Sequence, residues 1–198
     1  ERLRAASMTL NPSKCSFGYK EVKILGHVVN EEGIGPDLTK VQVVQDFEPP
    51  RRLRNLRSFL GLCNYYRKFV PNYSEIARPL TQLTRKDVRF QWNQEQQDAF
   101  QTLKDKLTSS PILRHFSPIL PVKLHTDASD LGVGATLIQV ENEDSLPVAY
   151  GSRRLSEAEK KYTTTEKECI AVVWALQHFR QFLWGRKFTI VVDHHALC

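Results

Sequence analysis

Five segments in the last third of the chain constrain its fold most strongly. Residues 119–126, 133–140 and 146–152 are predicted to be consecutive strands, followed by a helix over 164–183 and a strand at 188–193. The first and third strands of an antiparallel meander run the same way, and a helical crossover returns the chain parallel to the strand it left. The sequence therefore predicts a mixed sheet in an α/β (α+β) fold, with its first and fourth strands pointing in one direction.

Three carboxylates are predicted to meet at one edge of this sheet. Asp127 follows the first strand and Asp193 ends the fourth, so both lie at carboxyl ends of parallel strands. The crossover helix runs antiparallel to its strands and brings Glu166 and Glu168 over the same edge. At about 100° per residue Glu168 borders the apolar stripe, whereas Glu166 lies on the outer face. The stripe consists of Val172, Leu176, Phe179 and Leu183. Because a carboxylate at a buried border must be paired or bound to a metal, Glu168 is the predicted third member.

The predicted set of Asp127, Glu168 and Asp193 suits a hard cation. Ligands that offer only oxygen favour Mg²⁺ or Mn²⁺, and two such ions about 4 Å apart can activate a water and stabilise a leaving oxygen in phosphodiester hydrolysis. The alternative is that the two aspartates cap turns and Glu168 pairs with Lys161 or Lys167. The strand order favours the metal site, because it brings the three carboxylates together without any assumption about a metal.

The first half of the chain is predicted to be a short helix, a hairpin and a series of helices. The hairpin turns at Gly18–Lys20 and is closed by residues 33–36. The predicted ranges are 1–7 for the first helix, 15–17 and 22–29 for the strands, and 38–47 (capped by Asp37), 53–69, 75–83 (capped by Ser74) and 94–107 for the later helices.

The helix at 53–69 combines an apolar side with basic and aromatic residues. Its apolar side contains Leu53, Leu56, Phe59, Leu60 and Cys63. The charge comes from Arg51, Arg52, Arg54, Arg57, Arg67 and Lys68, with Tyr65, Tyr66 and Tyr73 between them. The whole chain has a net charge of +6 and a pI near 9.2. Such a face is either a solvated surface or a module that rests on a nucleic-acid backbone, and the sequence leaves both open.

Composition excludes several classes of protein. The longest apolar runs, such as Cys169–Leu176, are far shorter than the roughly 20 residues that cross a bilayer, and no apolar signal segment follows Glu1. The four cysteines are too widely separated to predict a zinc site or a disulfide framework. We therefore expect an intracellular protein in a reducing compartment, without a membrane partner.

Several motifs, in order, resemble one known family. Residues 10–198 are similar to the Pol polyprotein of gypsy-type long-terminal-repeat retrotransposons and their retroviral relatives. Residues 10–15 with 24–27 resemble the end of the reverse transcriptase palm, where Leu25-Gly26-His27 matches the primer grip. Residues 56–69 resemble the thumb signature. Thr126-Asp127-Ala128-Ser129, Glu166-Lys167-Glu168 and Val192-Asp193-His194 resemble the first three metal-ligand motifs of the ribonuclease H domain, although Val192 stands where the family usually has Thr.

The resemblance implies four regions and an activity for the whole protein. The regions are the end of the palm with the primer grip (1–36), a helical thumb (37–86), a connector (87–115) and a C-terminally truncated ribonuclease H-like domain (116–198). The implied activities are copying of RNA into DNA and Mg²⁺-dependent hydrolysis of the RNA strand of RNA/DNA hybrids. The implied catalytic metal ligands are Asp127, Glu168 and Asp193. The implied nucleic-acid contacts are Leu25, Gly26, His27, Arg57, Asn64, Tyr65, Arg67 and Lys68.

The resemblance also implies partners and locations. The partners are an RNA/DNA hybrid or primer–template duplex and the rest of the Pol polyprotein, in the cytoplasm, a retrotransposon particle or the nucleus. The chain contains no Tyr-x-Asp-Asp motif and no adjacent aspartates, so we expect no polymerisation by this chain alone. The family's fourth carboxylate lies beyond Asp193, which leaves open whether the chain alone is an enzyme. The alternative is a non-catalytic nucleic-acid-binding fragment of a decayed element that uses the basic thumb helix.

Overall fold

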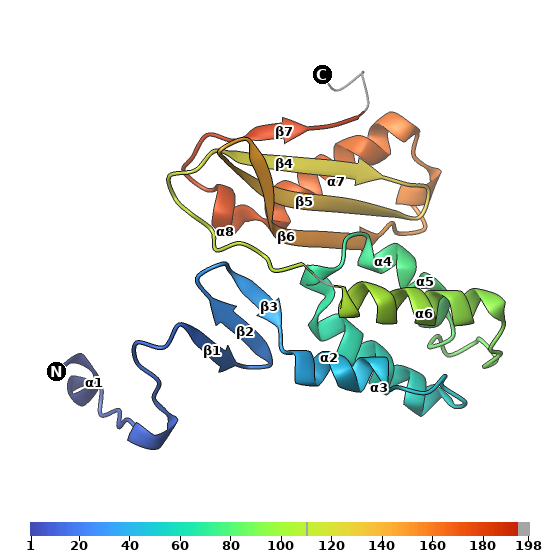
Figure 1. Ribbon diagram of the computed structural model, residues 1–198. Helices are drawn as coiled ribbons and strands as arrows, with labels where there is room; N and C mark the ends of the chain where they lie inside the picture. The colour runs from blue at the N-terminus through green and yellow to red at the C-terminus, as the bar shows by residue number, and fades with distance from the viewer. Residues whose placement is uncertain (110, 194–198) are drawn as a thin grey trace.

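The computed structural model describes residues 1–109 and 111–193, which form two sheets and a group of helices (Figure 1). The first sheet has the order β1-β2-β3 and the second the order β6-β5-β4-β7. The strands are β1 (Glu21–Ile24), β2 (His27–Asn30), β3 (Ile34–Pro36), β4 (Val122–Ala128), β5 (Gly132–Glu141), β6 (Asp144–Arg154) and β7 (Thr189–Val191). The α-helices are α1 (Arg2–Ala5), α2 (Leu38–Gln45), α3 (Leu53–Tyr65), α4 (Tyr73–Ile76), α5 (Arg78–Gln82), α6 (Gln94–Thr108), α7 (Thr164–His178) and α8 (Arg180–Leu183). The short 3₁₀ helices are η1 (Pro12–Lys14), η2 (Arg67–Phe69) and η3 (Glu159–Lys161). No helix of the described residues is long and apolar enough to cross a membrane.

The N-terminal hairpin turns at a different place from the one the sequence predicted. β1 pairs with β2 through a tight turn at Leu25 and Gly26, whose φ angles are 47° and 72°. The predicted strand 22–29 is therefore wrong, because its apolar pattern continues through a turn that Gly26 permits. The predicted strand at 15–17 is also wrong, because these residues pair with no strand. They follow η1, a short helix that the side chain of Asn11 caps. β3 continues the sheet and forms a bridge to Leu113.

The helices α2 to α6 form what we call the helical module (residues 38–108). Asp37 caps α2 as predicted, by accepting a hydrogen bond from the Thr39 N–H at 3.1 Å. The predicted helix 53–69 is confirmed up to Tyr65 and wrong over its last four residues, since α3 ends at Tyr65 and η2 follows. The predicted helix 75–83 is two helices, and Asn72, in the left-handed conformation, precedes the first of them instead of Ser74. Pro79 sits in the first turn of the second, where its missing N–H costs nothing.

The helical module has one apolar core, to which α6 contributes. Phe59 of α3 is fully buried, and its ring centroid lies 4.5 Å from that of Phe100 of α6 and 5.4 Å from that of Phe47. Leu103 and Leu107 of α6 are buried in the same core. Helix α6 belongs to the segment 87–115 that was predicted to be a connector. It packs on the helices of the segment 37–86 that was predicted to be the thumb.

The four-stranded sheet confirms the predicted topology. β4 pairs antiparallel with β5 and parallel with β7, so the fourth strand lies beside the first. The loop predicted at 141–145 is shorter, because Asn142 and Glu143 adopt positive φ angles and close a tight turn. The crossover predicted as one helix over 164–183 is α7 followed by the short α8, and Gly185 ends it with a φ of 74°.

The helical module is fixed to this sheet through β6. The Ser74 N–H donates to Ser152 Oγ at 3.0 Å, and the Arg67 guanidinium donates to the Ser152 carbonyl oxygen. Arg154 donates to the Arg78 carbonyl oxygen at 2.8 Å. Tyr150 packs against the core of the helical module. Side chains on one face of β6 thus hold the helical module against the four-stranded sheet.

An ion pair fixes the segment between β6 and α7 and predicts a pH dependence. Arg153 donates to both carboxylate oxygens of Glu159 at 2.9 Å, and these bonds hold the pKa of Glu159 at about 2. Because this pKa is lower than the value in the unfolded chain, the pair stabilises the fold at neutral pH and loses its contribution as the pH falls toward 2. We expect Glu159→Gln to reduce the free energy of unfolding by about 1 kcal/mol at pH 7, since the pair is partly solvated. Urea unfolding should show less than half of that difference at pH 3, and an undiminished difference would contradict the assignment.

Candidate active site

The structure brings Asp127, Glu168 and Asp193 together, and we call these three residues the carboxylate site. Asp127 lies near the end of β4, Asp193 lies two residues after β7, and Glu168 is in the second turn of α7. One carboxylate oxygen of each lies within 4.8 Å of the others. Asp127 and Asp193 are exposed, whereas Glu168 is only 3% exposed. Oxygen atoms at this spacing fit a hard divalent cation such as Mg²⁺ or Mn²⁺.

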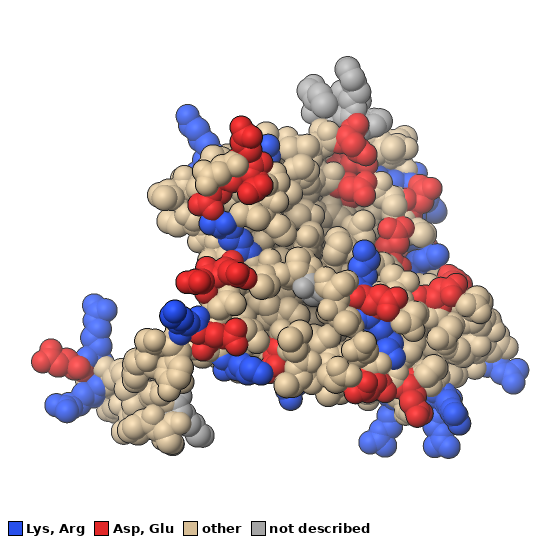
Figure 2. Space-filling model, in the orientation of Figure 1, with Lys and Arg blue, Asp and Glu red and all other residues tan. Residues whose placement is uncertain are grey.

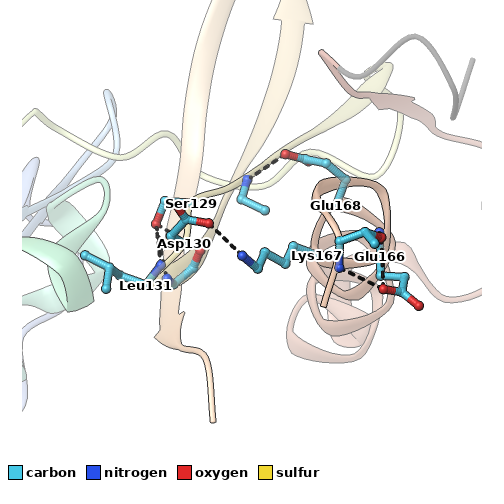
Figure 3. A network of polar contacts seen from close by, with 9 residues as sticks. Ser129, Asp130, Leu131, Glu166, Lys167 and Glu168 are labelled. Carbon is cyan, nitrogen blue, oxygen red and sulfur yellow. Dashed lines mark hydrogen bonds and ion pairs between the residues drawn. The ribbon is translucent and has the colours of Figure 1, made fainter. Parts of the chain in front are cut away.

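Glu168 is held toward the site by the sheet and by its own helix. Its Oε1 accepts a hydrogen bond from the Ala128 N–H at 3.2 Å, one residue after Asp127 (Figure 3). The helix buries Glu168, Ala171 and Ala175 against the sheet, so Glu168 lies within the buried stripe rather than at its border. The alanines allow this close approach, whereas Val172 and Leu176 are only half-buried.

The neighbouring Glu166 caps the N-terminus of α7 instead of facing the carboxylate site. Its carboxylate accepts hydrogen bonds from the Thr163 N–H at 2.8 Å and from Thr163 Oγ1 at 2.9 Å. The Thr163 hydroxyl in turn accepts from the Glu166 N–H, which completes a capping box at the start of α7. These bonds lower the pKa of Glu166, the backbone bond most strongly. Glu166 is therefore exposed, as its helical phase predicted, and it is also part of the helix cap, which was not predicted.

Lys167 makes a second link between α7 and the turn after β4. Its ammonium group donates to Asp130 Oδ1 at 2.6 Å, and its side chain is only 9% exposed although that of Asp130 is 91% exposed (Figure 3). This hydrogen bond lowers the pKa of the Asp130 carboxyl group. The turn itself is held by Ser129, whose Oγ accepts from the N–H groups of Leu131 and Gly132. Adjacent residues of α7 thus contact the chain on both sides of Ser129.

A hollow of about 340 Å³ lies beside the carboxylate site. Its lining includes Asp127 and Asp193 from the sheet edge and Asn72 from the helical module. Figure 2 shows Asp and Glu side chains grouped over the ends of β4 and β7. Asn72 was not among the residues predicted for the site, and its only local signal is the Pro71-Asn72 pair before a helix, which is typical of a turn.

Of the predicted primer-grip residues, Leu25 and Gly26 form the turn between β1 and β2, and His27 begins β2. Leu25 is 81% exposed, and its carbonyl oxygen accepts a hydrogen bond from the Tyr65 hydroxyl. The Gly26 carbonyl oxygen accepts from the Tyr66 hydroxyl at 2.9 Å. The His27 ring lies 5.3 Å from that of Tyr65, and burial is the main cause of its lowered pKa. The structure therefore joins the turn to the end of α3.

Of the remaining predicted nucleic-acid contacts, two are exposed on α3 and two contact other groups of the chain. Arg57 and Asn64 are exposed on α3, and Figure 2 shows Lys and Arg side chains along the lower edge of the helical module. Arg67 contacts Ser152 of the sheet, and its guanidinium lies 5.5 Å from the centre of the Tyr73 ring. The Lys68 ammonium lies over the Phe69 ring at 5.1 Å, and burial lowers its pKa. The structure thus gives Arg67 a contact between the two parts of the chain that the sequence did not predict.

Comparison with protein families agrees with this arrangement. Residues 92–190 match the model of the RNase H-like domain found in reverse transcriptase. The chain belongs to this family. The match begins before α6, covers β4, β5, β6 and α7 and ends within β7, so the matched region includes Asp127 and Glu168 and stops three residues before Asp193.

Curated relatives of this RNase H-like chain are retrotransposon polyproteins. The chain is 39% identical over 196 residues to the retrovirus-related Pol polyprotein from transposon 412 of Drosophila melanogaster, covering 99% of this chain and 16% of that protein. It is 38% identical over 200 residues to the transposon Tf2-3 polyprotein of Schizosaccharomyces pombe, covering 100% of this chain and 15% of the relative. The chain thus spans about a sixth of the length of these relatives.

Solved structures show the same fold. The foamy viral protease-reverse transcriptase in complex with RNA/DNA hybrid matches with a TM-score of 0.77 and 26% identity, covering 92% of this chain and 25% of that one. A form of the same enzyme in complex with double-stranded DNA matches with a TM-score of 0.76 and 27% identity over 88% of this chain and 31% of the other.

Proposed function

We propose that this chain is part of a retrotransposon Pol protein in which the carboxylate site hydrolyses the RNA strand of RNA/DNA hybrids. The observation that carries the proposal is the approach of Asp127, Glu168 and Asp193 within 4.8 Å, with Asp127 and Glu168 inside the region that matches the RNase H-like family and Asp193 three residues after it. The solved relative that binds an RNA/DNA hybrid supports this choice of substrate. The reverse transcriptase activity of the whole protein belongs to the same proposal, and the regions 1–36, 37–86, 87–115 and 116–198 remain its proposed divisions.

The three carboxylates would hold Mg²⁺ or Mn²⁺, which we propose as two ions. Bound in this position, the ions supply an activated water and charge stabilisation at the leaving oxygen. The protein's own groups fix the ligands. The Ala128 N–H holds Glu168 in orientation, and the Lys167–Asp130 pair fixes α7 against the turn after β4. The exposed edges of Asp127 and Asp193 leave room for a nucleic-acid strand in the hollow of about 340 Å³.

A cleavage assay tests the proposal. The chain, and the chain extended by any sequence that follows it in the polyprotein, is incubated with an RNA/DNA hybrid of defined sequence and Mg²⁺ or Mn²⁺. We expect cuts in the RNA strand only, and none after chelation by EDTA. A DNA duplex and a double-stranded RNA of the same sequence serve as controls. Absence of metal-dependent cleavage by both proteins would overturn the proposal.

A second candidate function is nucleic-acid binding through the helical module without catalysis. The observation that favours it is the exposed Leu25 turn held by Tyr65 and Tyr66 at the end of α3, beside exposed Arg57 and Asn64. A helix with exposed arginines and one half-exposed aromatic ring, that of Tyr65, suits the backbone of a duplex. In this proposal the partner is a hybrid or a primer–template duplex, and the contact surface consists of Leu25, Gly26, His27, Arg57, Asn64, Tyr65, Arg67 and Lys68.

Charge reversal on α3 tests this binding surface. We expect Arg57→Glu to weaken hybrid binding several-fold and to reduce the slope of log Kd against log salt by about 1, since one phosphate contact releases about one counterion. Lys187→Glu, an exposed residue of the turn after α8, changes the net charge equally and should have little effect. Fluorescence anisotropy at several salt concentrations measures both. A Kd that does not change with salt would contradict the idea.

A further inference from the structure

A row of three aligned residues crosses the sheet face opposite α7. Asp127 opposes Gly134 on β5, and Gly134 opposes Ser152 on β6, so the three share one face. Gly151 belongs to the other face, where a Cβ atom would lie 2.8 Å from the His178 ring of α7. At the Ser152 end of the row the helical module lies against the sheet, because the Ser74 N–H donates to Ser152 Oγ. The Asp127 end remains exposed.

Asn72 occupies the middle of this row. A Cβ atom at Gly134 would lie only 2.4 Å from Asn72 Oδ1, so the amide takes the space that a side chain at Gly134 would fill. Opposed residues of antiparallel strands have Cβ atoms about 4.5–5.5 Å apart, which places the amide beside Asp127. Asn72 lines the hollows on both sides of Asp127. A residue from outside the RNase H-like sheet thus completes the surroundings of the carboxylate site.

The Asn72 side-chain amide is held in place by its backbone but makes no hydrogen bond within the described residues. Its backbone has a φ of 52° and leads into α4, whose Ser74 is bonded to Ser152 at 3.0 Å. The side-chain amide makes no hydrogen bond within residues 1–109 and 111–193. The docking of α4 on β6 therefore fixes an amide that has both its donor and its acceptor available.

We propose that Asn72 hydrogen-bonds a ribose 2′-hydroxyl of the RNA strand next to the phosphodiester that the carboxylate site cuts, an inference that rests on the proposed function. A hydroxyl donates and accepts, as an amide does. A phosphate contact would favour Lys or Arg, and neither is found among the described residues that line the two hollows. Since the 2′-hydroxyl distinguishes RNA from DNA, Asn72 selects the RNA strand.

Two alanine variants test the contact. Asn142→Ala is the matched control, because Asn142 is also exposed, has a φ of 49° and lies in the turn at the far end of β5. The probes are a fluorescently labelled RNA/DNA hybrid and a DNA duplex of the same sequence, with binding followed by anisotropy. We expect Asn72→Ala to raise the Kd for the hybrid about 5- to 10-fold, the loss of roughly one hydrogen bond. The Kd for the DNA duplex should not change, and Asn142→Ala should change neither.

Gly134→Ala gives an independent measurement. Its methyl group would displace Asn72, so it should weaken hybrid binding as Asn72→Ala does, with no further loss in the double variant. Equal hybrid affinity of Asn72→Ala and Asn142→Ala overturns the inference, as does an equal loss on the DNA duplex or failure of the unsubstituted chain to bind the hybrid. Absence of metal-dependent cleavage by an unsubstituted chain whose hybrid binding still depends on Asn72 overturns the proposed function instead.

Discussion

Asp127→Asn should abolish metal-dependent cleavage of the RNA strand, with a loss of more than about 100-fold. Outer partners of metal ligands already cost roughly 10- to 100-fold when they are removed, and Asp127 would be a ligand itself. Its carboxylate oxygen lies within 4.8 Å of those of Glu168 and Asp193. Cleavage rates at saturating Mg²⁺, measured for both proteins on one labelled hybrid, test this expectation.

Thermal unfolding separates lost chemistry from lost folding in this variant. Without metal, three carboxylates at this spacing repel one another, so Asp127→Asn should unfold at an equal or higher temperature than the unsubstituted chain. Mg²⁺ should raise the Tm of the unsubstituted chain, because binding stabilises the folded state, and should raise that of the variant much less. Asp144→Asn, an exposed carboxylate at the start of β6, is the control with the same charge change. A variant that keeps both cleavage and the Mg²⁺ response would contradict the assignment of Asp127.

Strand order and helix phase explain why the carboxylate site could be predicted from the sequence. The parallel pairing of β4 and β7 follows from a meander and one crossover helix, and it fixes which ends of the strands meet. Glu168 could be separated from Glu166 because the two positions differ in helical phase. Its place at the centre of the buried stripe was missed, because Ala171 and Ala175 carry too little apolar surface to mark the face that approaches the sheet most closely.

The remaining differences come from contacts between residues that are far apart in the chain. Arg67 resembles the other basic residues near α3 in the sequence, yet it donates to Ser152, which lies 85 positions later. Asn72 gains its place only because Gly134 has no side chain to exclude it. The turn at Leu25 and Gly26 was hidden by a continuous apolar pattern, and the hydroxyl groups of Tyr65 and Tyr66 that hold it lie 40 residues away. No local pattern encodes such pairs.

Phe59→Ala should lower the free energy of unfolding of the helical module by about 3–5 kcal/mol, the usual cost of emptying a fully buried phenylalanine site. Phe59 is 0% exposed and packs between Phe47 and Phe100, which places α6 in the same core as α3. If α6 unfolds with that core, hydrogen exchange should show its amides losing protection together with those of α3. Leu124→Ala, in the core of the four-stranded sheet, should instead reduce protection first in β4, β5 and α7. Retention of protection in α6 while α3 loses it would contradict a shared core and would mean that α6 unfolds separately from α3.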